Sequence, residues 1–553
     1  MERENFVDGI PGTELLVKIE KNQTDSVKDI EIVNIPAPTS CAGDPLAWPR
    51  LKKFWQLFVV SLYACCFAFG ENNLGAAWTT VSDDIGVNMD NMNGGSALNW
   101  LLLGFFNVLW IPTAMKLGRR PVFIATTSIA LCAMVWIGKC NGTASWFLAM
   151  TLNGLGVAGY EAMIQLSIFD TFFIHERGRA LAVYLFSQQI GGVIGLVSGG
   201  AIADSIGWRW SQYIVAIADA VILLIFIFTF QESLFPRFLF DRVEHTKYLE
   251  AVKSGEIEYT SDGLNLSEEV IKDKETYKLS LEQEVDSITE YNEPNPDDFP
   301  RQSFKKSILK WWVYYPQDKT TFWQYFRRPF ILFTFPNILY AGFNFGFGGT
   351  AGMLSFSTIA EILMDEPYNY STSTTGLMCL GSLVGCCLGW ASGSASDYIV
   401  IYFAKRNNGI KEPEMRLYAM IFPFIFGSIG YMMYGWGAQQ EDKWPVISVG
   451  IGFMTAQQVS SCSIATSYAM DCFRGISGEL VVVLAIFSAL INFAVSYSCQ
   501  EFLTAVGYGW LMFFWGMLVL TANGSCVLVM KYGKGWRKRS ANRYFKFVEE
   551  GKQ

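Results

Sequence analysis

The sequence predicts an all-α membrane protein in which twelve transmembrane helices form two six-helix halves. Hydrophobic residues make up 51% of the 553-residue chain and charged residues only 17%, whereas soluble domains carry about 25% charged residues. The apolar residues gather in runs of about 20, the length that a helix needs to cross the hydrocarbon core of a bilayer. A long polar stretch near the middle of the chain separates these runs into two sets of six.

The composition along the chain predicts five parts. Residues 1–52 are polar and rich in proline, and we expect a flexible cytoplasmic tail. Six-helix bundles are expected over 53–232 and 330–531. A cytoplasmic central loop over 233–329 should join them, and a second cytoplasmic tail should cover 532–553.

Lysine and arginine residues predict the orientation, because cytoplasmic loops carry an excess of them. They concentrate near both termini and in the loops after the second, fourth, eighth and tenth spans. Both termini are therefore predicted to be cytoplasmic, in a plasma-membrane protein. The sequons at Asn141 and Asn369 then fall in outward-facing loops and are predicted glycosylation sites. The expected spans run approximately over 54–78, 96–116, 121–139, 145–170, 180–203, 209–230, 330–361, 374–399, 416–437, 445–469, 478–502 and 508–530.

Within the central loop, residues 304–330 mix aromatic side chains with lysine and arginine. Such a segment can lie along the cytoplasmic headgroups of the bilayer. A partly ordered linker with an aromatic belt would explain the same composition.

Several function classes are disfavoured by composition. The 12 cysteines lie mostly inside predicted spans without metal-ligand spacing, and the two histidines, His175 and His245, lie in predicted loops. We therefore expect no cofactor, no metal site and no enzyme activity. No Walker-type loop is visible, so ATP drive is not expected either. The expected partners are a small-molecule substrate, protons and the lipid bilayer, with no nucleic acid, for a protein that acts as a monomer.

Glu161 lies near the middle of the fourth predicted span, between apolar and small residues. A carboxylate at that depth costs about 2.5–3.5 kcal/mol even on lenient insertion scales, so such residues usually face water or a partner. The functional interpretation is that Glu161 faces a wet cavity and binds a proton or a cationic group. A protonated acid hydrogen-bonded between helices is the alternative.

Short motifs predict where the helices pack and where the protein changes conformation. Gly118, Arg119 and Arg120 form a tight cytoplasmic turn, in which the arginines can face helix C-termini or neighbouring carboxylates. Glycines recur every four residues further on, which places them on one helix face suited to close contact with another span. Acids near cytoplasmic span ends are expected to pair with arginines as structural or gating contacts. The glycines are Gly191, Gly195 and Gly199; the acids are Asp170, Asp397 and Asp471, with Arg177 among the arginines.

These motifs carry a resemblance. The chain from about 45 to 545 is similar to the major facilitator superfamily, and within it to the fungal twelve-span drug:proton antiporter family. The subgroup it resembles most is the one related to the yeast histidinol and polyamine transporter. The chain departs from the family pattern at Met115, Met150 and Leu196, where an aspartate, an arginine and a proline are usual. The family motifs are 117–120, 176–180, 191–200, 207–210 and 232–237; those of the subgroup are 44–48, 161–170, 396–398, 416–418 and 468–472.

The resemblance implies that the first, fourth, seventh and tenth spans line a central path. Polar residues occur on those spans without any lysine or arginine well inside them, which suits a cationic substrate. Glu71 could instead lie at the outer end of its span, already in water. The residues expected to bind substrate or protons are Glu71, Asn72, Tyr160, Glu161, Gln165, Tyr340, Asn344, Gln457 and Gln458.

The sequence therefore predicts a proton-coupled secondary transporter that moves a small organic cation, polyamine-like or drug-like, by alternating access. Drug resistance is an implied consequence. The alternatives are an importer of a neutral solute, such as a sugar or amino sugar, and a nutrient sensor with a transporter fold.

Overall fold

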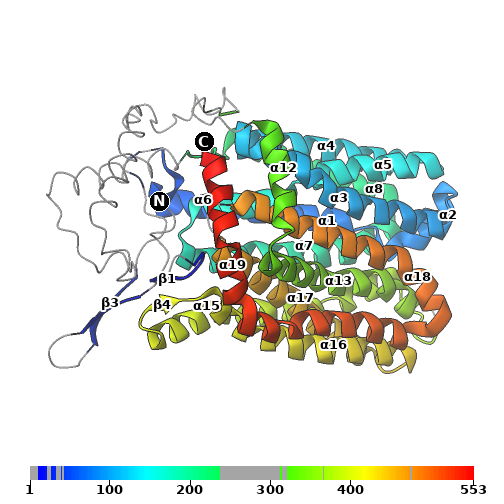
Figure 1. The fold of residues 1–553 in the computed structure, drawn as a ribbon. Coiled ribbons are helices and arrows are strands. Elements are labelled where there is room, and N and C mark those ends of the chain that lie inside the picture. The colour runs from blue at the N-terminus through cyan, green and yellow to red at the C-terminus, as the bar shows by residue number, and fades with distance from the viewer. Residues whose placement is uncertain are drawn as a thin grey trace, which may run out of the picture.

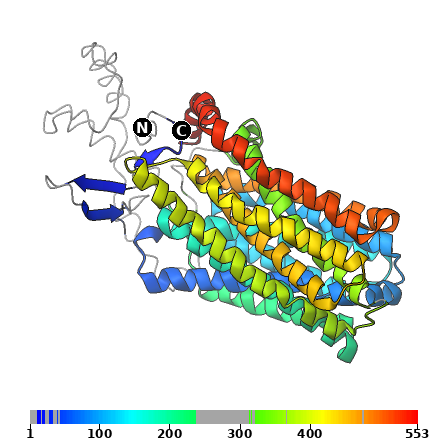
Figure 2. The same cartoon turned by 90° about the horizontal axis from the view of Figure 1, so that it is seen from below.

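The computed structural model describes residues 10–15, 17–21, 27–32, 39, 41, 43–236, 312–313, 315, 321–364, 366–473 and 476–552. The long helices run roughly side by side in one bundle, and both termini lie at the same end of it (Figures 1 and 2). We call this the termini end and the opposite one, which carries α2, the far end. Most of the predicted central loop, including 237–311, lies outside the described residues.

Six spans form the N-terminal half, and short helices at the far end join the first two. The fourth span is made of two helices because the chain turns at Ala158 and Gly159. The helices are α1 (Arg50–Asn72), η3 (Gly75–Ala77), α2 (Trp78–Ile85), α3 (Met89–Leu117), α4 (Arg119–Lys139), α5 (Thr143–Val157), α6 (Tyr160–Thr171), α7 (Ile174–Ile206) and α8 (Trp208–Phe228).

The C-terminal half also has six spans, preceded by the amphipathic helix α12 at the termini end. The second of these spans is again broken, between α14 and α15. The helices are α12 (Phe322–Leu332), α13 (Pro336–Met364), α14 (Thr372–Met378), α15 (Gly381–Arg406), η6 (Pro413–Met420), α16 (Ile421–Gln439), α17 (Trp444–Cys472), α18 (Ser477–Gly524) and α19 (Cys526–Lys552).

Among the described residues, the helices run from one end of the bundle to the other twelve times. This confirms the predicted fold class. Ten helical stretches are long and apolar enough to span a membrane. One of them, Ser477–Val548, contains two crossings, because Gly507 has a non-helical backbone (φ 82°) and the chain reverses there. The remaining crossing is α17, whose many buried serines and glutamines keep it outside the ten.

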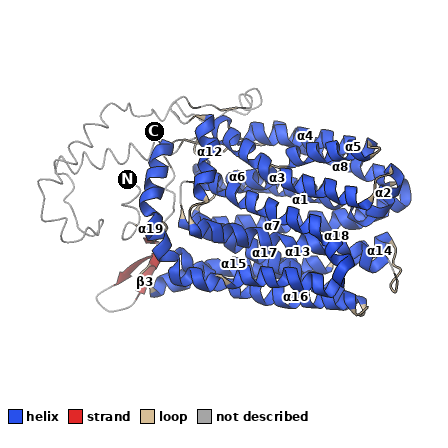
Figure 3. Ribbon diagram, turned by 45° about the vertical axis from the view of Figure 1, so that its right-hand side comes forward, coloured by secondary structure: helices blue, strands red, loops and turns tan. Residues whose placement is uncertain are grey.

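Four short strands lie at the termini end, beside the helical bundle (Figure 3). β1 (Glu14–Leu15) pairs antiparallel with β4 (Ile410–Lys411), which precedes η6. β2 (Val17–Lys21) pairs antiparallel with β3 (Val27–Ile32). A 3-10 turn, η2 (Pro45–Ala47), follows before α1. The segment expected to be a flexible tail thus contains paired strands, and most of the segment expected to be the second tail is the helix α19.

The two halves contact each other towards the termini end, and α7 also meets α14 at the far end, where a Cβ at Gly376 would lie 2.6 Å from the Cα of Val197. Val481, Val482 and Ile486 of α18 belong to the buried cluster formed by the N-terminal half. A Cβ at Gly104 of α3 would overlap Ala489 of α18. The bundle is therefore closed at the termini end, and open space between the halves remains towards the far end.

Candidate functional site

A cavity of about 330 Å³ lies between the two halves, towards the far end. Helices α1, α3 and α7 line it from the N-terminal half, and α13, α17 and α18 from the C-terminal half. None of the described residues that line it is a lysine or an arginine. Its polar side chains are Glu71, Asn72, Asn93, Ser96, Gln188, Gln189, Ser357, Thr358, Glu361, Gln458, Asn492, Ser496 and Gln500, and Trp78 and Trp100 add aromatic surface.

Glu71 on α1 is held in the cavity wall by two amide side chains. Asn99 of α3 donates from Nδ2 to Oε2 of Glu71 (3.0 Å), and Asn153 of α5 donates from Nδ2 to Oε1 (2.8 Å). Asn153 also donates to Oδ1 of Asn99 (3.2 Å), so the three side chains form one network. The amides fix the position of the carboxylate without neutralising it. In the described part of the chain no ion pair is formed by Glu71, so no basic side chain there offsets its charge.

Glu361 on α13 is a second carboxylate at the same cavity, contributed by the other half. Gln500 of α18, which also lines the cavity, lies with Nε2 3.4 Å from Oε1 of Glu361. Sequence reasoning missed Glu361 because it stands at the last position of the predicted seventh span. An acidic residue at such a position is typical of the end of a span and does not by itself indicate a binding site. Its position in the outer half of a span expected to line the path was the signal that could have identified it.

Three predicted substrate residues, Glu71, Asn72 and Gln458, line the cavity. The others pack beside it or further towards the termini end. Tyr160 stacks on Phe67 (ring centroids 4.1 Å apart) and accepts a hydrogen bond from the cavity-lining Gln188.

Three of the remaining predicted substrate residues have hydrogen bonds or ring contacts inside their own half. Gln165 donates to the hydroxyl of Tyr184 (3.0 Å). Asn344 donates to the carbonyl of Ala522 (3.1 Å), and the ring of Tyr340 meets that of Tyr468 edge-on. Gln457 is fully buried, and neither of its side-chain amide atoms has a hydrogen-bond partner among the described residues.

Glu161 is not among the residues that line this cavity, contrary to the expectation for it. It is the second residue of α6, after the turn that breaks the fourth span, so it lies nearer the termini end than Asn153 does. Its side chain is partly exposed, within electrostatic range of Tyr184 and of Cys462 in the other half. Glu161 therefore faces the region where the halves have closed, and Glu71 occupies the open cavity.

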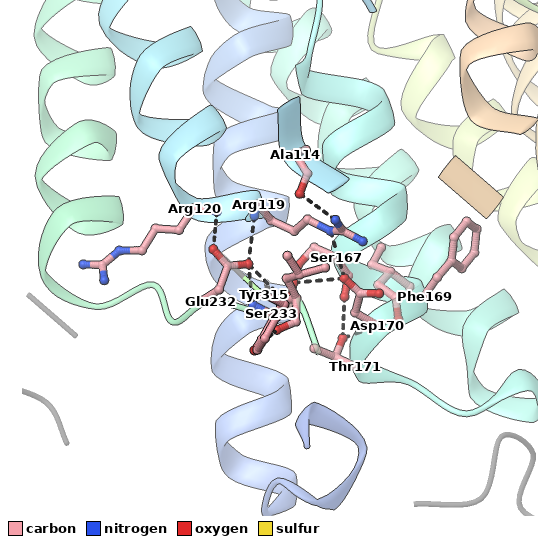
Figure 4. A network of polar contacts seen from close by, with 12 residues as sticks. Ala114, Arg119, Arg120, Ser167, Phe169, Asp170, Thr171, Glu232, Ser233 and Tyr315 are labelled. Carbon is pink, nitrogen blue, oxygen red and sulfur yellow. Dashed lines mark hydrogen bonds and ion pairs between the residues drawn. The ribbon is translucent and has the colours of Figure 1, made fainter. Parts of the chain in front are cut away.

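The turn that begins α4 is held by a network of polar contacts within the N-terminal half (Figure 4). The side chain of Arg119 pairs with Asp170 (Nε to Oδ2, 3.1 Å). Arg120 donates to the carbonyls of Phe226 and Ile227 at the C-terminus of α8. The predicted partners of these arginines, a carboxylate and a helix C-terminus, are thus both present, and neither crosses to the other half.

Glu232 completes this network as the N-terminal cap of α4. Its carboxylate accepts from the backbone N–H groups of Arg119 (2.8 Å) and Arg120 (3.0 Å), an arrangement that also suits the positive end of the helix dipole. Burial raises the pKa of Glu232, and these backbone donors oppose that effect. Gly118, with φ 108°, leaves the space that the carboxylate occupies.

A second cluster of paired acidic and basic side chains lies in the C-terminal half. Arg416 bridges Asp397 (Nη1 to Oδ1, 2.6 Å) and Asp471 (Nε to Oδ2, 2.9 Å). Lys411 also pairs with Asp471 (2.7 Å). Asp397 reaches across to the N-terminal half, where it lies so close to Gly178 that a Cβ there would overlap its carboxylate.

Arg177, a predicted partner of these acids, donates to the carbonyls of Phe169 (2.8 Å) and Phe172 (3.1 Å) in its own half. The predicted glycosylation sites, Asn141 and Asn369, are exposed side chains in the α4–α5 and α13–α14 connections. Both connections lie at the far end of the bundle, so the two sequons share one side of it.

Comparisons with known proteins agree with this architecture of two six-helix halves around a cavity, which is that of a secondary transporter. The Major Facilitator Superfamily profile matches residues 60–519. The chain belongs to this superfamily.

Its relatives include fungal transporters that it matches over most of their length. An uncharacterized MFS-type transporter of Schizosaccharomyces pombe is 28% identical, over 99% of this chain and 96% of that protein. Protein HOL1 of Saccharomyces cerevisiae is 26% identical, over 86% and 85%. MFS-type transporter penM of Penicillium rubens is 25% identical, over 92% and 90%. Among solved structures, the proton:xylose symporter XylE bound to 6-bromo-6-deoxy-D-glucose aligns with a TM-score of 0.57 at 14% identity, over 87% and 97%.

Proposed function

We propose that this protein is a proton-coupled transporter of small organic cations and that Glu71 binds the cationic group of the substrate. The observation that carries the proposal is the charge of the cavity: one carboxylate from each half, Glu71 and Glu361, and no basic side chain among the described lining residues. A cation gains an ion pair there, whereas an anion would be repelled by both carboxylates and would find no basic side chain among the described lining residues. Trp78 and Trp100 offer ring faces for cation–π contact.

Proton coupling needs a group whose charge changes during the cycle, and we propose Glu161 for that role. Glu161 forms no ion pair or hydrogen bond among the described residues. It lies where the halves meet in this conformation and would gain access to water when the termini end opens. A carboxyl group that alternates between a closed and a wet environment can take up and release a proton within one cycle.

The test uses vesicles that contain the purified protein, with and without a pH gradient. Uptake of labelled spermidine, a cationic drug and an amino sugar is measured for the parent and for Glu71→Gln. We expect the variant to lose at least tenfold in uptake of both cations. Glu501→Gln, the same change at an exposed position beside the cavity residue Gln500, should transport normally. Cation uptake that survives in Glu71→Gln would overturn the assignment.

A neutral solute is the second candidate substrate, favoured by the many amide side chains of the cavity, among them Asn72, Gln188 and Gln458. These groups suit hydroxyl-rich ligands, and XylE, whose fold aligns with this chain, is a proton:xylose symporter. Amino-sugar or xylose uptake without cation uptake in the same vesicles would favour a neutral solute as the substrate. A transporter-like sensor would bind one of these probes and move none.

We also propose that the protein is a monomer of the plasma membrane with both termini in the cytoplasm, so that the cavity opens outward. The prediction rests on the basic residues near the termini, and the far-end positions of Asn141 and Asn369 support it. Glycosidase treatment of intact cells should shift the protein on a gel, and Asn141→Gln with Asn369→Gln should abolish the shift. Accessibility of a terminal tag in unpermeabilised cells would contradict the orientation.

A further inference from the structure

The N-terminal segment of the chain is attached to both halves at the termini end. Residues 10–15 lie on the C-terminal half, where Ile10, Thr13 and Glu14 are each no more than 5% exposed. Residues 43–48 lie on the N-terminal half, where η2 packs on α6. We call these the first anchor and the second anchor, and the chain from 10 to 48 the strap. Transport chemistry at the cavity, at the other end of the bundle, uses none of these residues.

The first anchor is docked in a site formed by β4 and α19 of the C-terminal half. β1 adds to β4 as an antiparallel strand, pairing Glu14 with Lys411. Arg537 of α19, which is fully buried, donates to the carbonyl of Pro11 and to Oγ1 of Thr13 (3.1 Å). The same guanidinium pairs with Glu414 (Nε to Oε1, 2.9 Å), so its donors are divided between the strap and η6.

Gly12 brings the first anchor onto the end of α17. Its φ is +80°, and a Cβ there would overlap the carbonyl oxygen of Asp471 and lie 3.0 Å from that of Cys472. Asp471 is held by Lys411 and Arg416, and Arg416 also holds Asp397. The anchor is therefore packed against the cluster whose outermost member, Asp397, touches the N-terminal half.

The second anchor is stabilised by its own turn. Asp44 is fully buried and accepts hydrogen bonds from the backbone N–H of Leu46 (2.9 Å) and from both the backbone and the hydroxyl of Thr39 (2.9 and 3.0 Å). Lys52 lies over the ring of Trp48 (3.5 Å to the centroid). The sequence motif over 44–48, which the transport site leaves unexplained, is thus the fixed end of the strap.

The hairpin between the anchors shortens the strap. Twenty-seven residues, 16–42, connect the two anchors, and a fully extended chain of that length would reach about 95 Å. Because β2 and β3 pair with Val17 opposite Ile32, only the residues outside the hairpin contribute, and the reach falls to about 40 Å. Separation of the halves beyond this reach requires the hairpin to open or an anchor to leave its site.

We propose that the strap stabilises the conformation closed at the termini end, and that undocking of the first anchor shifts the protein towards the conformation open at that end. In alternating access the two halves separate at one end as they close at the other. A segment bound to both halves at the termini end favours the state in which they are together, because separation beyond its reach costs either the hairpin or an anchor. This inference depends on neither the cargo nor the coupling ion of the proposed function.

The test measures how often the termini end opens. Val482 is fully buried and packs against the N-terminal half, so a Val482→Cys reporter reacts with a thiol reagent only when the halves separate. Its alkylation rate is followed by peptide mass spectrometry in the full-length protein in membranes. We expect Gly12→Ala in this background to raise the rate at least threefold.

Two further variants make the result decisive. Gly142→Ala is the matched control, because Gly142 has nearly the same φ (+78°) with nothing within 4 Å of the added Cβ, and it should leave the rate unchanged. Thr13→Val removes only the hydroxyl that accepts from Arg537 and should raise the rate in the same direction, so it decides the question if Gly12→Ala does not fold. An unchanged rate in folded Gly12→Ala, or in Thr13→Val where the first does not fold, would overturn the proposal.

Discussion

Glu71 is a carboxylate that two neutral donors hold in place inside a membrane protein. Asn99 and Asn153 each donate one hydrogen bond to it, which offsets part of the cost of removing the charge from bulk water. A lysine or arginine in the same place would stabilise the carboxylate more and would compete with the substrate. The neutral donors thus fix the geometry and leave the charge available.

The network at Glu232 makes a prediction about Gly118. A Cβ there would lie 2.8 Å from the carboxyl carbon of Glu232, so Gly118→Ala should displace Glu232 from the N-terminus of α4. Gly207 precedes α8 with a similar φ of 96° and open space around it. Both alanine variants should lose about 1–3 kcal/mol to backbone strain.

Gly118→Ala should lose about 1–3 kcal/mol more, for the broken hydrogen bonds of Glu232. Thermal unfolding in detergent measures the difference. Equal melting temperatures for Gly118→Ala and Gly207→Ala would show that Glu232 contributes nothing as a cap.

Sequence reasoning could find polar residues at depth but not the side of a helix they face. Glu71 and Glu161 were both predicted from their place in apolar spans, yet only Glu71 lines the cavity. The difference comes from the break between α5 and α6 and from which end of the bundle is closed. Glu361 was missed for a related reason, because hydropathy gives the length of a span and says nothing about whether its last turn points inward.

At the scale of helices, α7 and α1 form the closest contact within the N-terminal half. A Cβ at Gly191 would lie 2.7 Å from the carbonyl carbon of Cys65, and one at Gly195 would lie 3.0 Å from the Cα of Phe69. A Cβ at Gly199 would lie 2.7 Å from the carbonyl carbon of Asn73. The four-residue spacing predicted such a face, but only the structure identifies its partner, which lies in the same half.

Gly195→Ala should therefore separate α7 from α1, because its obstacle is backbone that cannot rotate away. Gly192→Ala is the comparison: its Cβ would lie 3.3 Å from Nδ2 of Asn72, the end of a movable side chain. We expect a loss of several degrees in melting temperature for Gly195→Ala and a change of about one degree or less for Gly192→Ala. Fluorescence-detected size-exclusion chromatography after heating measures both, and equal stability would contradict the role of the glycine face.

The helix α19 could not be predicted from hydropathy, because it is rich in lysine and arginine, and most of it was expected to be a tail. Its order comes from tertiary contacts such as the pairing of Arg537 with Glu414, which join residues more than 120 positions apart. Local sequence carries no signal for such a contact, whereas the lengths of apolar runs predicted most of the other spans.

At the scale of the whole molecule, closure at the termini end and a cavity towards the far end describe one of the two states that alternating access requires. Met115 of α3 and Gly478 of α18 meet at the closed end: a Cβ at Gly478 would lie 2.6 Å from Sδ of Met115. A disulfide formed between cysteines at these two positions would link the halves there. Shortening Met115 to cysteine removes the Sδ atom that the new Cβ would meet, and the bond can form where the two Cβ atoms lie about 3.5–4.5 Å apart.

Oxidised Met115→Cys/Gly478→Cys should therefore bind substrate from the far end and fail to transport it. Reduction should restore transport, since only the separation of the halves was blocked. The 12 native cysteines carry no disulfide in their described positions, and each single variant, treated with the same oxidant, controls for their reaction. Transport that continues at full rate through the cross-linked protein would mean that the termini end does not open, and the cavity would then serve binding alone. Loss of both binding and transport would instead indicate that the bond distorts the N-terminal half, because a lock at the termini end leaves Glu71 in place.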